Sequence, residues 1–554
     1  MLDRISELEG RYKVMRKRWL RNRAIHALLI SVTLLFNISP HIPSHASGIP
    51  SEITGMQIDA SDENDNTRPL SHIAVHTNGR SFLCKGINDP TCNGDEIGVT
   101  AYLQPCSMTV TLGCIRNVYA VSDTGTRTEA QFTRVIDQHD KDFDFEQSVE
   151  RNLVAGSGVG SVWRIPGVVH GGGSDIYTVD ALLGGSSFLG NPFSYDKVQI
   201  GIAAANEVPG AFSPMGFALS SDSSIAGIGS MGGGQYCEKS LAQDGRSCFL
   251  KSRMPSGFRF GIELSLPNPL SGWFHGRIFR PQIEIEVADK SSYIYRFEAE
   301  PVTVPILDDR LEQDSWSQEF KSYVNASWPI AHSGQLMPGS SGDLALGLAS
   351  RYLPLIGDKA TSTGDFWTVK TLGGWNNVEP RVFSCSADKQ IVSGIVTTNA
   401  MVYKAGPPSF NSQTQTMDYK VLSPHYDEEG KENLGSYDLL LNSTVARCIY
   451  GFTTAPIRAE IEVLGGDGIS KVATTLLGER GDWLFLSANG FTYSEPTVRV
   501  KLIQATPPAS SEVDSTPVVK SKSSKKITIT CKKGSNLKKI TQAKPRCPRG
   551  FKRI

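Results

Sequence analysis

The chain lacks the sequence motifs by which many enzymes are recognised. No H-E-x-x-H, Walker or G-x-S-x-G sequence occurs among its 554 residues, so common signatures of metalloproteases, P-loop proteins and α/β-hydrolases are absent. No C-x-x-C step occurs either, and structural zinc sites usually contain such steps. We therefore expect no resident metal or cofactor, and we favour a protein that is not an enzyme.

Long apolar runs are also scarce. The longest is 24–38, and its 15 residues fall short of the roughly 20 needed to span a bilayer. Five Lys and Arg residues precede it within 16–23, and Ser44 and Ala46 place small side chains at the −3 and −1 positions of a cleavage site. Residues 1–46 are thus typical of a signal peptide cleaved after Ala46. The alternative is an uncleaved signal anchor, through which alone the protein would contact a membrane.

Acidic residues are missing from the C-terminal end, where none follows Asp514. Residues 511–554 carry thirteen Lys and Arg against two acids, and residues 1–23 carry eight against three, although the whole chain has 56 of each sign. The body between these two ends is therefore acidic. Such a basic segment favours binding to an anionic polymer or surface, and the alternative is a tail that is merely solvated.

All ten cysteines follow the apolar stretch, as expected for a protein exported to an oxidising compartment. They form five local couples, and nearest-neighbour pairing predicts five disulfides, although the first four cysteines could exchange partners. The couples are Cys84/Cys92, Cys106/Cys114, Cys237/Cys248, Cys385/Cys448 and Cys531/Cys547.

Short runs of alternating apolar and polar residues recur through most of 50–505, separated by Gly, Pro, Asn and Asp turns, and they predict β-strands of sandwich-like domains. Apolar residues at helical spacing within 315–358 are the main exception. We therefore expect a mainly β protein with two or more β-sandwich-like domains, a small helical insert and a C-terminal disulfide-linked basic hairpin. The expected parts are a signal peptide or anchor (1–46), an N-terminal β-rich region (47–310), a helical connector (311–358), a C-terminal β-sandwich-like domain (359–505), a disordered linker (506–524) and the basic tail (525–554).

The tail itself has hairpin character. Two runs rich in Ile and Thr, 527–531 and 537–541, flank a Gly-Ser-Asn turn. A Cys531–Cys547 bond closing a loop of about 15 residues would add on the order of 3 kcal/mol of stability in the chain-entropy model. We expect this segment to be an electrostatic tether to an anionic surface, through Lys525, Lys526, Lys532, Lys533, Lys538, Lys539, Lys544, Arg546, Arg549, Lys552 and Arg553.

The tail, with TITC, KKIT, KPRCP and GFK, resembles a C-terminal segment that recurs on secreted actinobacterial proteins. The stretch 445–502 is similar to a β-module found beside that tail, and MPSGFRFG (254–261) and SGWFHGRI (271–278) resemble pieces of the same cell-surface group. The resemblance implies export, an actinobacterial envelope and β-rich domains. It implies no activity, ligand or catalytic residue, because none is assigned to that group.

One short segment, GWFHGRIFRP (272–281), concentrates aromatic and cationic side chains. Trp273, His275, Arg277 and Arg280 are candidates for a ligand face that would contact a sugar or an anionic group. The alternative is an ordinary strand whose Trp and Phe enter the core and whose charges face solvent.

Two other patterns favour structural interpretations. The sequence His170-Gly-Gly-Gly173 is similar to an oxyanion-hole loop, but without a nucleophile motif it is expected to be a turn. Acidic runs at 59–66 and 137–146 contain the carboxylates that Ca²⁺ prefers, yet neither has the central Gly and twelfth-position Glu of an EF-hand loop. Solvated acidic surfaces are expected at both runs.

These observations favour an exported cell-surface protein, structural or ligand-binding, whose tail attaches to anionic envelope polymers or lipids. A glycan is a further candidate ligand. Nucleic acid is disfavoured, because the tail offers only Phe551 for base stacking. The alternative is a secreted glycan-active or other hydrolase, whose paired carboxylates would be too far apart in the sequence to recognise.

Overall fold

The computed structural model describes residues 53–58, 71–504 and 527–553, apart from internal gaps, of which 211–239 is the longest. The predicted signal peptide and linker lie outside the described residues. The chain divides into two compact units, Met1–Ile503 and Gln504–Ile554. The gaps are 78–79, 91, 137–143, 211–239, 244–245, 290–291, 328–333, 373–377, 387–390, 454–456, 465–469, 472–473, 494–496, 535 and 543–545.

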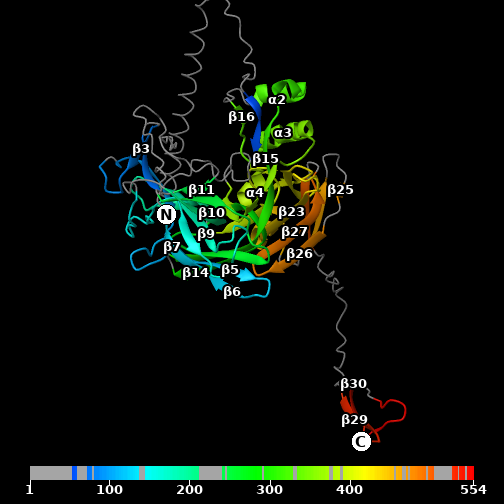
Figure 1. Ribbon diagram of the computed structural model, residues 1–554. Coiled ribbons are helices and arrows are strands. Elements are labelled where there is room, and N and C mark those ends of the chain that lie inside the picture. The colour runs from blue at the N-terminus through cyan, green and yellow to red at the C-terminus, as the bar shows by residue number, and fades with distance from the viewer. Residues whose placement is uncertain are drawn as a thin grey trace, which may run out of the picture. The chain divides into compact units, whose positions relative to one another are not determined.

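Unit 1 is built mainly from antiparallel sheets, which confirms the mainly β, sandwich-like fold (Figure 1). Its longest sheet runs β3–β2–β4–β9–β10–β18–β14–β19–β23–β27–β26, and the β14–β19 ladder is the parallel one in this run. The strands are β2 (His72–Thr77), β3 (Arg80–Cys84), β4 (Glu96–Tyr102), β9 (Ile176–Phe188), β10 (Ser194–Pro209), β14 (Gly272–Asp289), β18 (Thr368–Thr371), β19 (Val392–Thr398), β23 (Leu434–Asn442), β26 (Thr474–Arg480) and β27 (Trp483–Thr492).

A second layer faces the first half of this sheet across a shared hydrophobic core. It runs β6–β5–β13–β15 and is completed by the far half of the long strand β14. Side chains such as Ile262 and Phe297 from this layer meet Val179 and Ile200 from the first, all of them nearly inaccessible to solvent. The strands of this layer are β5 (Cys114–Ser122), β6 (Arg127–Glu129), β13 (Phe258–Leu266) and β15 (Ser292–Arg310). β1 (Ile53–Ile58) and β17 (Ser362–Phe366) pair with β15, and β16 (Gly334–Leu336) pairs with β1. Two strand pairs extend instead from the longest sheet: β8 (Ser161–Arg164) with β7 (Gln131–Val135) from β9, and β12 (Ser247–Lys251) with β11 (Ser240–Gln243) from β10.

A third sheet packs on the second half of the longest sheet. Its strands run β20–β22–β28–β24–β25, with β21 paired to β22. Tyr419 and Val500 of this sheet share a core with Leu439 and Leu486 of the longest one. The strands are β20 (Val402–Tyr403), β21 (Ser409–Asn411), β22 (Thr416–Leu422), β24 (Ile457–Leu464), β25 (Ser470–Lys471) and β28 (Thr497–Gln504).

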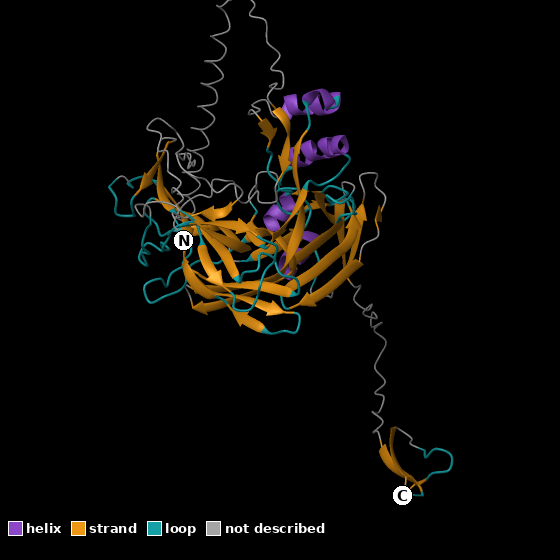
Figure 2. Cartoon of the chain, viewed as in Figure 1, coloured by secondary structure: helices purple, strands orange, loops and turns teal. Residues whose placement is uncertain are grey.

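In the part of the chain that the structure describes, helices are few and short, as Figure 2 shows. Four of them fall inside the predicted helical segment 311–358 and pack on β1 and the end of β15. Within the described residues, no helix has both the length and the hydropathy to cross a membrane. The helices are η2 (Gln313–Ser315), α2 (Gln318–Ser327), α3 (Asp343–Tyr352), η3 (Leu353–Ile356), α4 (Pro380–Cys385) and α5 (Ser443–Tyr450).

Ladders connect the two β-rich regions that the sequence analysis separated at 311–358. Strand β14 pairs with β18 and with β19, which lie on the other side of the helical segment in the sequence. Strands of both predicted regions therefore belong to one sheet and one compact unit. Such pairing is invisible in local patterns, because alternation predicts a strand but not its neighbours.

The predicted disulfides are confirmed wherever both cysteines are described. Cys84 pairs with Cys92 and Cys106 with Cys114, so the first four cysteines do not exchange partners. Cys385–Cys448 joins the ends of two short helices, α4 and α5, and Cys531–Cys547 closes the tail. These bonds are typical of an oxidising, extracellular environment.

The fifth predicted couple, Cys237/Cys248, is described at one end. Cys248 lies on β12, is 4% exposed and is disulfide-bonded. Its predicted partner, Cys237, lies outside the described residues, so the pairing of these two cysteines stays a prediction. Within the described part of the chain, no cysteine is free.

Unit 2 is the predicted hairpin with one additional short strand. Strands β29 (Ile527–Lys533) and β30 (Asn536–Gln542) pair antiparallel, and β31 (Lys552–Arg553) pairs with the other edge of β29. Ile529 and Cys531 are buried in this small sheet, whereas the neighbouring Thr528 and Lys532 are exposed. This alternation is what a strand with one covered face requires.

Candidate functional sites

The segment predicted to be an aromatic and cationic ligand face lies in the interior of unit 1. Trp273 is 1% exposed, and His275 and Arg277 are fully buried. The first half of β14 lies between β18 and β19, and hydrophobic cores cover both of its faces. Because the strand is central and covered on both sides, its odd-numbered side chains point into the interior and not toward an external ligand.

His275 packs by ring stacking in this interior. Its imidazole lies on the Tyr403 ring, with centroids 3.6 Å apart and planes 8° from parallel. Within the described part of the chain, neither ring nitrogen of His275 has a hydrogen-bond partner. Burial, together with the nearby positive charges of Arg277 and Lys370, holds the pKa of His275 well below its ordinary value. His275 is therefore a neutral core residue.

Arg277 is a buried cation held by oxygen atoms. Its guanidinium donates to the carbonyl oxygens of Thr398, Ala400 and Met401 and to Oγ of Ser340, with the Met401 contact at 3.0 Å. It also lies over the Tyr403 ring, 4.8 Å from the centroid. These contacts tie β14 to the segment that links β19 to β20, so the role of Arg277 in this structure is positional.

Arg280 is the predicted residue that reaches the surface. It sits at a register irregularity of β14 with a left-handed backbone (φ +49°), and its main-chain N–H donates to Asp438 Oδ2 at 2.7 Å. Asp438 also accepts from Ser487 Oγ at 2.5 Å and is fully buried. Burial raises the pKa of Asp438 to about 6, although these hydrogen bonds oppose the rise. The Asp438 carboxyl group thus has structural partners.

The His170 glycine turn is structural as well. The His170 ring is 3% exposed, its Nδ1 accepts from the main-chain N–H of Gly172 at 3.0 Å, and its Nε2 contacts the carbonyl oxygen of Ala205 at 3.2 Å. Burial lowers the pKa of His170. A neutral ring protonated on Nε2 satisfies both contacts. The main-chain N–H of Gly172 donates to the His170 ring within the same turn, in agreement with the prediction of an ordinary turn.

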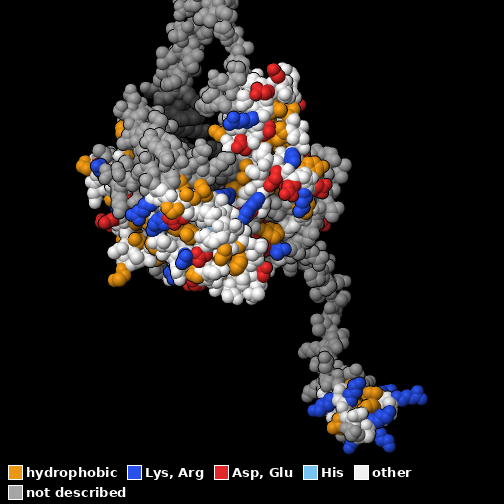
Figure 3. All heavy atoms as spheres, viewed as in Figure 1, with side chains coloured by type: hydrophobic (Ala, Val, Ile, Leu, Met, Phe, Trp, Pro, Cys, Tyr) orange, Lys and Arg blue, Asp and Glu red, His pale blue; other side chains and the backbone are white. Residues whose placement is uncertain are grey.

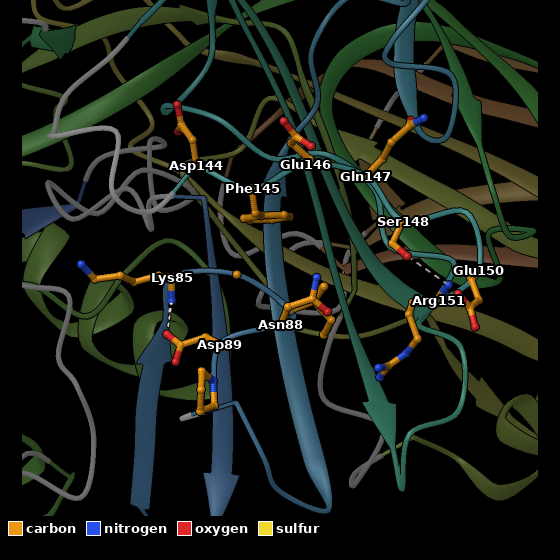
Figure 4. Close-up of a pocket in the computed structure, with 13 residues that line it drawn as sticks. Lys85, Asn88, Asp89, Asp144, Phe145, Glu146, Gln147, Ser148, Glu150 and Arg151 are labelled. Carbon is orange, nitrogen blue, oxygen red and sulfur yellow. Dashed lines mark hydrogen bonds between the residues drawn. The ribbon is translucent and has the colours of Figure 1, made fainter.

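Unit 1 has a pocket that the sequence analysis did not identify (Figure 4). It has a volume of about 980 Å³ and lies between the loop closed by Cys84–Cys92 and the segment 144–151. Phe145 is buried at its wall, and charged side chains of both signs surround it. Those are Lys85, Asp89, Asp144, Glu146, Glu150 and Arg151.

Several of these pocket residues have partners in the fold. Asp144 accepts from Ser157 Oγ at 2.9 Å and from the main-chain N–H of Gly158 at 3.3 Å, and Asp89 accepts from the main-chain N–H of Lys85 at 2.9 Å. Among the described residues, no group of three or more His, Cys, Asp or Glu side chains is placed to hold a metal ion. The acidic residues 59–66 and 137–143 lie outside the described residues. The Cys84/Cys92 couple and the acidic run 137–146 are each visible in the sequence, but they are far apart there, and only the tertiary structure brings 85–90 and 144–151 to one pocket.

The tail unit presents a dense set of positive charges (Figure 3). Every predicted tether residue that the structure describes is exposed, and residues 525–554 contain no acid to neutralise them. Lys525, Lys526 and Lys544 lie outside the described residues. The exposed cations are Lys532, Lys533, Lys538, Lys539, Arg546, Arg549, Lys552 and Arg553.

Neither a protein-family model nor a curated protein nor a solved structure matches this chain.

Proposed function

We propose that this is an exported cell-surface protein, structural or ligand-binding, whose basic tail tethers it to anionic polymers or lipids of the cell envelope. The observation that carries the proposal is the exposure of all eight described tail cations in a segment, 525–554, whose sequence contains no acidic residue. The small β-sheet and the Cys531–Cys547 bond hold these charges together. An actinobacterial envelope is part of the proposal through the resemblance of the tail.

The energetics favour attachment over mere solvation. Near an anionic surface each Lys or Arg contributes on the order of 1 kcal/mol, and the attraction is screened by salt. Several such charges on one small folded segment act together, whereas residues 525–554 contain no acidic side chain that would offset their mutual repulsion in the free protein. An anionic partner removes that repulsion.

The proposal is tested by the retention of the exported protein on cells. The full chain is compared with a variant lacking 525–554 and with a variant in which the eight described tail cations become Gln. Both variants are expected in the medium, and washing the wild type at about 1 M salt should release it too, because the Debye length then shrinks to about 3 Å. A charge-conserving variant that exchanges Lys and Arg at the same eight positions is the matched control and should stay bound. Unchanged retention after both deletion and salt would contradict the proposal.

A further inference from the structure

The two faces of the tail sheet are not equivalent. In an antiparallel ladder, directly opposed residues project to the same face. Lys532 is opposed by Leu537 on β30 and by Lys552 on β31, and Lys539 is opposed by Thr530. These side chains, with Thr528, therefore share one face, which we call the open face. Its members are Thr528, Thr530, Lys532, Leu537, Lys539 and Lys552.

The opposite face is the covered one. It carries Ile529, which is 4% exposed, and Cys531, which is fully buried. Cys531 is bonded to Cys547, so the chain beyond β30 crosses this side of the sheet. A Cβ placed on Gly550 would lie 3.3 Å from Lys533 Nζ, which puts the 548–551 turn beside the same face. The disulfide loop thus covers Ile529 and Cys531 on this face, whereas no segment among the described residues of the tail covers the other face.

The open face combines two features that are unfavourable in isolation. Lys532 and Lys552 are directly opposed across the β29–β31 ladder, and like charges in that position destabilise a sheet. Leu537, opposite Lys532 on the other side, is 63% exposed. Both features become favourable against a partner that is negatively charged at its surface and apolar just beneath it.

We infer that the open face docks on an anionic lipid bilayer, with Lys532, Lys539 and Lys552 at the headgroups and Leu537 inserted below them. The inference rests on the proposed tether and makes it specific. A soluble or wall-bound polyanion would bind the lysines but would gain nothing from Leu537. A bilayer interface gains from both, since charge attraction and apolar burial add in interfacial binding.

The test is a vesicle-binding assay with the full chain. Vesicles of phosphatidylcholine containing about 30% phosphatidylglycerol supply the anionic surface, pure phosphatidylcholine vesicles are the neutral control, and inorganic polyphosphate is the lipid-free polyanion. Replacing the three open-face lysines (K532Q/K539Q/K552Q) should weaken binding to anionic vesicles by about 100-fold. The matched control K533Q/K538Q/R553Q removes the same charge from the other face and should weaken it by less than about tenfold.

Leu537→Ala separates the bilayer from other polyanions. It should weaken vesicle binding by about tenfold and leave polyphosphate binding unchanged. Equal effects of the two triple variants, or no effect of L537A on vesicle binding, would overturn the inference. Binding to polyphosphate without binding to anionic vesicles would also overturn it and leave the tether intact. Binding to neither would count against both proposals.

Discussion

The imidazole of His275 lies flat against the phenol ring of Tyr403, 3.6 Å between centroids, in a region that no solvent reaches. The pair joins β14 to β20, and therefore the longest sheet to the third one. The same interior holds the Arg277 guanidinium, which also lies over Tyr403. A stacked neutral imidazole beside a buried cation makes this junction sensitive to protonation.

Acid is expected to destabilise the protein through His275. Its folded-state pKa lies well below 6.5, so the unfolded chain binds the proton first as the pH falls. The stability contribution is complete above about pH 6.5 and declines below it. We expect H275F, which keeps a ring for stacking, to lose less unfolding free energy between pH 7 and 5 than the wild type. Urea unfolding at several pH values measures this, and parallel profiles for the two proteins would contradict it.

Asp438 is expected to destabilise the protein as the pH rises, which is the opposite of the effect of His275. Its folded-state pKa of about 6 is above the ordinary 3.8, so the folded protein holds the proton more tightly. Stability from this group is therefore complete below about pH 4 and is lost as the pH rises to about 6. Relative to D438N, the wild type should lose on the order of 3 kcal/mol between pH 4 and 7. The same urea series measures the difference in unfolding free energy between the wild type and D438N. A difference that does not change between pH 4 and 7 would contradict the raised pKa of Asp438.

Arg277→Met should destabilise the fold severely. A methionine side chain suits a buried position, but it leaves the carbonyl oxygens of Thr398, Ala400 and Met401 without their hydrogen-bond donor. We expect a loss of at least about 3 kcal/mol in unfolding free energy. Arg280→Met is the matched control, because the Arg280 side chain is 52% exposed and its main-chain bond to Asp438 remains. The control should change the unfolding free energy by less than about 1 kcal/mol. Equal losses in the two variants would contradict a stabilising role for the hydrogen bonds from Arg277 to the three carbonyl oxygens.

The disulfides should differ in their contribution to stability. Cys385–Cys448 closes 63 residues and Cys106–Cys114 closes 8. The chain-entropy model gives about 4 kcal/mol for the longer loop and about 2.5 kcal/mol for the shorter. C385S/C448S should therefore unfold at lower denaturant concentration than C106S/C114S. The reverse order would show that local packing outweighs loop entropy at these sites.

Local patterns predicted the parts of the molecule that depend on near neighbours in the sequence. The alternation in FRFGIELSL became β13, and each couple of adjacent cysteines with both members described is bonded. The stretch around Cys448 is different. Its resemblance to a β-module predicts strands, whereas 443–450 forms α5. The Asn442 side chain caps this helix and accepts from the main-chain N–H of Thr444 at 2.9 Å. The segment has only 8 residues, and over so short a length the apolar spacing of a helix cannot be distinguished from that of a strand.

The sequence by itself determined the β-rich class and the basic tail, because alternation and charge are local properties. Cysteine spacing favoured nearest-neighbour disulfides, but only the structure excluded exchange among the first four cysteines. The tertiary structure alone decided the fate of Trp273, His275 and Arg277. Their exposure depends on β18, β19 and β20, which lie beside β14 in the fold; the first of them, β18, begins at Thr368, 91 residues after Arg277. It likewise decided which face of the tail is covered by the described residues, since that depends on the side on which the Cys547 loop returns. Burial is a property of long-range neighbours, and a strand pattern does not identify them.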